Sequence, residues 1–155
     1  MISRPAWVIL AAGLGLGCAA PKSPFMPVTD VKRLMQAVID PAADHLWDAV
    51  GWVSDSNGTV EFAPTSPEEW DAVRNSASIV AESGNLLMME GRARDRGEWM
   101  TLSRAMIEAG RQAALAAEKR DKDAVFEAGG VVYEACSKCH AAYLIPLAPP
   151  GGKPK

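Results

Sequence analysis

The chain has 155 residues, of which 48% are hydrophobic and 23% are charged. This balance is typical of one globular domain and excludes a disordered or fibrous chain. Sixteen basic and nineteen acidic residues give a net charge of −3, whereas a groove that follows a phosphate backbone needs a positive surface. We therefore expect no nucleic acid among its partners. Three cysteines are too few for a disulfide framework, so any thiol chemistry depends on their local spacing.

The first 17 residues are typical of a signal peptide, because Arg4 precedes an apolar run over residues 6–17. That run is shorter than the roughly 20 residues that span a bilayer, so we expect an exported, periplasmic protein. Cys18 directly follows Leu-Gly-Leu-Gly and resembles the lipobox cysteine of bacterial lipoproteins. The resemblance implies that Cys18 is acylated, becomes the mature N-terminus and attaches the chain to a membrane. Ordinary cleavage among residues 18–20 is the alternative.

Residues 29–145 carry apolar side chains spaced by three and four, with almost no strand-like alternation. This periodicity predicts an all-α fold, and four such segments joined by modest connections favour an antiparallel four-helix bundle. Residues 18–28 are interpreted as a linker to this domain. Residues 146–155 hold four prolines and two glycines, which predicts a disordered tail.

The first helix is expected to begin at Thr29 or Asp30, since either side chain can cap it, and to end near Val53. Pro41 lacks a backbone N–H and crowds the preceding turn. It therefore predicts a kink or break near Asp40.

A polar stretch over residues 54–65 predicts a loop before the second helix. That helix has a strong start signal, because Ser66 and Glu69 form a capping box around Pro67. The apolar stripes of the last three helices are expected at Trp70, Val73, Ala77, Val80, Gly84 and Leu87, at Trp99, Leu102, Met106, Ala109, Ala113 and Ala117, and at Val125, Ala128, Val132, Ala135 or Cys136, and Cys139.

Three smaller features carry expectations about packing. The charged run from Arg92 to Arg96 predicts a solvated loop. Gly129 and Gly130 weaken a helix, so they predict a close approach of a cofactor or a tight helix contact. Four tryptophans are expected in the core or at the ends of the helices: Trp47, Trp52, Trp70 and Trp99.

The functional prediction depends on residues 136–140, where Cys136, Cys139 and His140 form the C-x-x-C-H attachment signature of a c-type haem. Residues three apart share a helix face, so both sulfurs can reach one edge of a porphyrin. His140 then presents its imidazole to the iron as an axial ligand. We therefore expect one covalent haem c. A thioredoxin-like pair would need an adjacent strand, and a zinc site would need four ligands, for which the mature domain adds only His45.

Only fifteen residues follow His140, and none is methionine, so a protein-derived sixth ligand must lie upstream. This motif on the last of four helices resembles the class II c-type cytochromes, the cytochrome c prime group, over about residues 28–143, including Tyr143. The resemblance implies a monohaem four-helix bundle. It also implies that Arg33 contacts a haem propionate, and that Val38 lies over an iron left five-coordinate.

The antiparallel geometry gives a second candidate for the distal side of the iron. It places His140 opposite the start of the first helix, where Met35 and Val38 lie one to two turns past Asp30. His45 lies roughly 22 Å along the helix from Asp30, which is too far to reach the iron. Two alternatives stay open: Met35 is the sixth ligand, or the position beside Val38 is unligated.

These features predict a monohaem cytochrome that carries single electrons through its haem iron. The alternative is a five-coordinate haem module that binds a small gas such as nitric oxide or carbon monoxide. The sequence contains no signal for a catalytic nucleophile, paired carboxylates or a substrate pocket. We therefore do not expect the protein to be an enzyme. The expected partners are redox proteins of unidentified kind, and membrane attachment through lipid and a homodimer stay open.

Overall fold

The computed structural model describes residues 23–144, and this part of the chain is mostly helical. The expected signal peptide (1–17), the lipidation at Cys18 and the tail (146–155) lie outside the described residues. The elements in order are α1 (Val31–Leu34), the π-helix η1 (Met35–Ile39), α2 (Asp40–Trp47), β1 (Gly51–Asp55), β2 (Gly58–Phe62), α3 (Pro67–Leu87), α4 (Glu98–Glu118) and α5 (Lys122–Tyr143).

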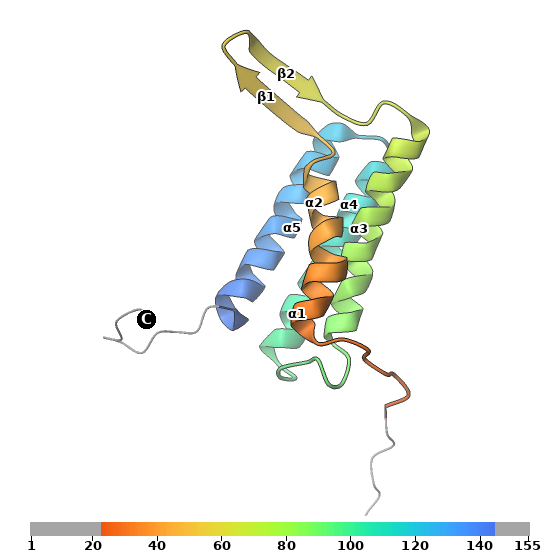
Figure 1. Ribbon diagram of the computed structural model, residues 1–155, viewed down its shortest axis with the longest axis vertical. Helices are drawn as coiled ribbons and strands as arrows, with labels where there is room; N and C mark the ends of the chain where they lie inside the picture. Colours follow the sequence, from red (N-terminus) through yellow and green to blue (C-terminus); the bar gives the residue numbers. More distant parts are fainter. Residues whose placement is uncertain (1–22, 145–155) are drawn as a thin grey trace, which may run out of the picture.

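The helices lie alongside one another, and the two strands project beyond one end of them (Figure 1). The segments α1, η1 and α2 follow each other in one column, which packs against α3 and α5. Both ends of the described chain lie at the end opposite the strands. None of the helices within residues 23–144 has the length and apolar character needed to cross a bilayer.

The α-helical hydrogen-bond pattern is interrupted immediately before Pro41, where an irregularity is expected. Met35 to Ile39 form a π-turn, in which the Asp40 N–H donates to the Met35 carbonyl. A π-turn holds one more residue than an α-turn, so it changes the direction of the side chains that follow. Ile39 becomes buried, with 3% of its surface exposed, whereas Val38 is half-buried.

The prediction of a loop over residues 54–65 is wrong, and so is the prediction that the first helix reaches Val53. The helix ends at Trp47, and the two strands pair antiparallel from Gly51 with Phe62 to Asp55 with Gly58. The Asn57 N–H donates to the Asp55 carboxylate at 2.7 Å, and Gly58 has a φ of 131° that suits glycine. An Asn-Gly turn between β-branched and aromatic residues thus makes a hairpin.

The hairpin rests on the first turns of α5. The Trp52 ring meets the Phe126 ring edge-on, with centroids 4.8 Å apart, and Glu61 forms an ion pair with Lys122. Trp52 is 49% exposed, so of the two places expected for it, the core and the ends of the helices, it takes the second. The strand alternation carries it to a face that α5 covers only in part.

The start of α3 confirms the predicted capping box. The Ser66 hydroxyl accepts the Glu69 N–H at 3.2 Å, and the Glu69 carboxylate accepts the Ser66 N–H at 3.1 Å. The stripe predicted for α3 is buried at every position. In the stripe predicted for α4, every residue is buried except Leu102, which is half-buried. In the stripe predicted for α5, every residue is buried except the two cysteines, which are half-buried.

Helices α3 and α4 pack so closely that their contact requires glycine. A Cβ at Gly110 would lie 2.6 Å from the Ala81 nitrogen, and one at Gly84 would lie 2.6 Å from the Ser103 carbonyl oxygen. Because the later residue of α3 meets the earlier residue of α4, the two helices run antiparallel. Without side chains at these two positions, the backbones approach each other directly.

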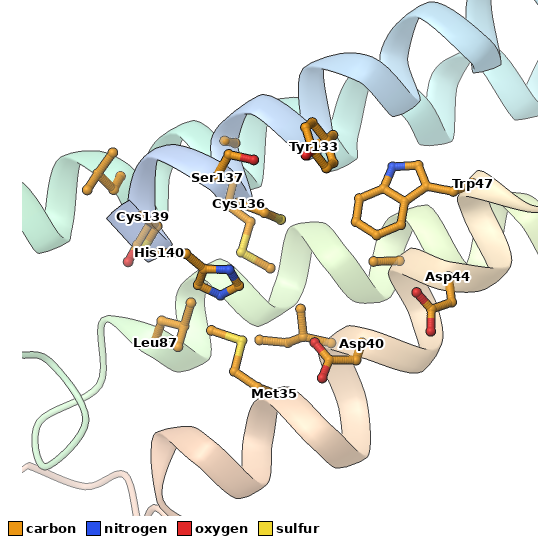
Figure 2. A pocket seen from close by; sticks show the side chains of 16 residues that line it. Met35, Asp40, Asp44, Trp47, Leu87, Tyr133, Cys136, Ser137, Cys139 and His140 are labelled. Atoms are coloured by element: carbon orange, nitrogen blue, oxygen red, sulfur yellow. The ribbon is translucent and has the colours of Figure 1, made fainter. Parts of the chain in front are cut away.

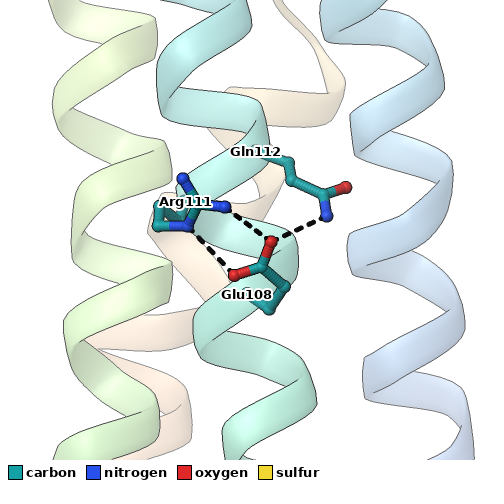
Figure 3. Close-up of polar contacts among 3 residues, drawn as sticks. All are labelled: Glu108, Arg111 and Gln112. Carbon is teal, nitrogen blue, oxygen red and sulfur yellow. Dashed lines mark hydrogen bonds and ion pairs between the residues drawn. The ribbon is translucent and has the colours of Figure 1, made fainter.

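The outer face of α4 is polar and is stabilised by local contacts (Figure 3). The Glu108 carboxylate accepts from Arg111 at 2.7 and 3.0 Å and from Gln112 at 2.9 Å. These hydrogen bonds, the one from Arg111 first, lower the pKa of Glu108 to about 2. Because the folded-state pKa lies below the usual value, this stabilisation is present above about pH 4.5 and is lost as the pH falls toward 2.

Residues 92–96 are predicted to form a solvated loop. This prediction is wrong for Arg92, which is only 6% exposed. Its Nε donates to the Thr29 carbonyl at 3.1 Å and its Nη1 to the Leu86 carbonyl at 3.2 Å. Carbonyls at the end of a helix lack partners within the helix, and a guanidinium can supply several donors at once. Arg92 therefore ties the segment before α1 to the end of α3.

We expect Gly110→Ala to lower the free energy of unfolding by about 1–3 kcal/mol, because the new methyl group meets the α3 backbone. Gly130→Ala is the matched control: a Cβ there has no neighbour within 4 Å, and alanine raises helix propensity by about 1 kcal/mol at most. Urea unfolding followed by circular dichroism measures both. Equal effects of the two substitutions would contradict the close α3–α4 contact.

Candidate functional site

The C-x-x-C-H motif lies in the last two turns of α5, as the sequence predicts. Asp121 begins this helix by accepting the Ala124 N–H at 3.0 Å. Cys136, Cys139 and His140 are all half-buried, and all three line one cavity. The helix thus brings both sulfurs and the imidazole to the same space.

This first cavity has a volume of about 350 Å³. Figure 2 shows Met35 from the facing segment, with its thioether directed toward the His140 ring. Asp40 and Asp44 lie along the α2 side of the cavity. The rest of the lining is mainly apolar: Ile39, Ala43, Trp47, Leu87, Leu102, Met106 and Ala135, with Ser103, Tyr133 and Ser137.

A second cavity of about 420 Å³ adjoins the first at the end of α5. Four residues line both cavities: Met35, Asp40, Cys139 and His140. The other residues of the second cavity are Val31, Lys32, Gln36, Arg94, Trp99, Tyr143 and Leu144. Met35 and His140 therefore stand at the boundary between two spaces.

The structure separates the two distal candidates that the sequence left open. Met35 lines both cavities, whereas Val38 lines neither and packs against the core. The π-turn accounts for this, because it carries Ile39 in place of Val38 to the first cavity.

The remaining sequence candidates lie away from the cavities. Arg33 is exposed and lines neither cavity. His45 is exposed on α2 and hydrogen-bonds through Nδ1 to the Ser76 hydroxyl at 3.0 Å. The cations that do line the second cavity are Lys32 and Arg94. Their position at the cavity was not predictable from the sequence, since the place of Arg94 depends on how the α3–α4 connection folds.

Both thiols of the motif are neutral groups near pH 7. Burial raises the pKa of the Cys136 thiol, and the nearby Cys139 and Asp40 add to that rise. Burial likewise raises the pKa of the Cys139 thiol, with a smaller contribution from Glu98. The neutral thiol is therefore favoured over the thiolate at both positions.

The end of α5 is held in place by Tyr143, which lies three residues after His140. Its hydroxyl donates to the Asp95 carboxylate, and its ring meets the Trp99 ring edge-on with centroids 4.9 Å apart. The Trp99 indole N–H in turn donates to the Leu87 carbonyl at 2.8 Å. These contacts fix the last turn of α5 against the ends of α3 and α4.

Gly129 allows a close contact between α5 and α2. The Trp47 indole N–H donates to the Gly129 carbonyl at 2.9 Å, and a Cβ at Gly129 would lie 3.3 Å from Trp47 Cδ1. Gly130 faces open space. Of the two reasons expected for these glycines, the tight helix contact therefore applies at Gly129.

No three or more His, Cys, Asp or Glu side chains within residues 23–144 form a group that could hold a metal ion. Comparisons of the chain with protein-family models, with curated proteins and with solved structures find no match.

The Tyr143 contact can be tested by titration. The hydrogen bond to Asp95, followed by burial, raises the pKa of Tyr143 to about 12. Because the folded-state pKa is raised, this hydrogen bond stabilises the fold below about pH 10 and is lost as the pH rises toward 12. We expect tyrosinate absorbance in a Tyr133→Phe background to show this midpoint.

Asp95→Asn should move that midpoint back toward the usual value for tyrosine, because the charged acceptor is gone. Far-UV circular dichroism recorded at each pH checks that the chain stays folded. An identical midpoint in both proteins would show that Tyr143 and Asp95 do not interact in solution.

Proposed function

We propose that the chain is an exported monohaem c-type cytochrome of the class II kind, an antiparallel four-helix bundle that carries single electrons through its haem iron. One observation carries this proposal. Cys136, Cys139 and His140 line a single cavity from the end of α5, and Met35 lines it from the facing segment. A covalent porphyrin needs two sulfurs and an imidazole on one helix face.

The residues present fit such a group. The lining is mainly apolar, which suits a porphyrin face, and the two adjoining cavities of about 350 and 420 Å³ are typical in size of ligand pockets. Asp44 lines only the first cavity and Asp40 lines both, whereas the two cations, Lys32 and Arg94, line only the second. Ion pairing would favour propionates at the second cavity.

When bound, haem c supplies the one-electron couple of its iron. Cys136 and Cys139 would anchor it, His140 would ligate the iron, and Met35 would offer a second protein ligand. Lys32 and Arg94 would pair with propionates in place of Arg33. Tyr143 and Asp95 hold the last turn of α5, and with it the imidazole, against α4.

Electron transfer is favoured over gas binding by the place of Met35. The resemblance implies that a gas-binding haem would have its open position beside the apolar side chain of Val38. Met35 lines the space next to His140 and Val38 does not. A methionine opposite a histidine is an axial pair that cytochromes use, and it raises the reduction potential.

The N-terminal pattern supports export with acylation at Cys18 and attachment to a membrane. Redox proteins are then the partners.

We expect the purified mature protein to keep its haem after denaturation in acid and organic solvent, with haem absorbance comigrating with the polypeptide. Cys136→Ser and Cys139→Ser should each leave at most one thioether bond, because each removes one sulfur. Ser137→Ala is the matched control within the same pentapeptide and should keep both bonds. Colour that extracts freely from the wild-type chain would overturn the proposal.

The axial pair is tested by Met35→Ala. If Met35 ligates the iron, the oxidised and reduced optical spectra and the electron paramagnetic resonance signal should change from low-spin to high-spin. His45→Ala, on the same helical column, should leave both spectra unchanged. A wild-type protein that is already high-spin, with no change in Met35→Ala, would instead support the gas-binding alternative.

A further inference from the structure

Three large apolar side chains stand exposed on the segment before α1, at the end of the molecule opposite the hairpin (Figure 1). We call this set, Phe25, Met26 and Val28, the end face. They are 67%, 82% and 87% exposed, respectively. Apolar side chains exposed together often mark an interaction surface.

The structure holds the start of this end face in a fixed position. Arg92, buried in the α3–α4 connection, donates to the carbonyl of Thr29 at 3.1 Å and lies 3.5 Å from its hydroxyl. Pro27 lies over Gly91, with its Cγ 3.6 Å from where a Cβ would be. Phe25 and Met26 therefore project from a segment attached to the α3–α4 connection, and they do not fold onto the core.

We propose that the end face lies in the headgroup and acyl boundary of a membrane. This inference rests on the proposed acylation of Cys18, which is five residues before Ser23. At about 3.4 Å per residue, that length of chain reaches no further than about 17 Å. An acyl chain buried in lipid would therefore bring Phe25 and Met26 to the membrane surface, where apolar side chains are stabilised by burial.

This orientation has a consequence for the candidate site. Val31 and Leu144 line the second cavity from the end-face side of the molecule, together with His140. The hairpin lies at the other end. The candidate cofactor site then lies at the membrane side of the molecule, and the partner that fits it is one whose redox centre lies near the membrane surface.

The end face is tested on mature holoprotein that carries Cys18→Ser and so has no acyl chains. We expect weak sedimentation with phosphatidylcholine vesicles at high lipid concentration. Phe25→Ser with Met26→Ser should lower the partition coefficient about tenfold or more, because it removes the apolar groups. Val53→Ser with Val60→Ser is the matched control, since these hairpin residues are 58% and 69% exposed. It should change the partition coefficient by less than about twofold.

The acylated protein gives a second measurement. Nitroxide labels on Glu90→Cys, near the end face, and on Asn57→Cys, at the hairpin turn, are exposed to vesicles with a nickel-chelating lipid. We expect strong relaxation of the first label and little of the second.

Several results would overturn the inference: no vesicle binding, equal effects of the two serine pairs, or stronger relaxation at the hairpin. Conversion of a solution dimer to a monomer by Phe25→Ser with Met26→Ser would assign the end face to a second copy of the chain instead. Mass analysis of the mature N-terminus tests acylation separately. Because binding is followed by the polypeptide, a lack of covalent haem would be seen in the same samples without changing these outcomes.

Discussion

The Asp95 carboxylate connects helix ends that are far apart in the sequence, and the geometry of the candidate site depends on it. It accepts the backbone N–H groups of Gly97 and Trp99 at 2.7 and 3.2 Å, which begins α4. It also accepts the Tyr143 hydroxyl, which ends α5. A single charged acceptor thus binds backbone N–H groups at the start of α4 and also makes a tertiary contact. Because His140 lies one turn before Tyr143, the position of its imidazole relative to α4 follows from this contact.

Much of the helical fold could be predicted from the sequence, because local signals and packing agree there. The Ser66 capping box and the apolar stripes of α3 and α4 follow from spacing alone. The hairpin was missed although Asn57-Gly58 is a turn signal, because the apolar residues before it extend the stripe of the first helix. Arg92 was missed for another reason: its burial depends on carbonyls that only the folded chain brings together.

The candidate site shows the same division between local and tertiary information. That Cys136, Cys139 and His140 share a face follows from helix geometry, and the placement of Met35 follows from an antiparallel arrangement. The exclusion of Val38 could not be predicted. Pro41 indicates that the α-helical pattern changes nearby, but whether a kink, a break or a π-turn results depends on packing.

Met35 and the motif cysteines reach the cavity from the two ends of the described chain, since Met35 and Cys136 are about 100 residues apart. Helices α3 and α4, in contrast, are neighbours in sequence and meet directly at Gly84 and Gly110. Closing a long loop costs more conformational entropy than closing a short one, so we expect the α3–α4 pair to form early and the first helical segment to dock last. Until then the cavity is not closed around the Cys136 and Cys139 sulfurs. Under the proposed function, haem attachment would therefore compete with the final folding step, and a chain that folded more slowly would be modified more completely.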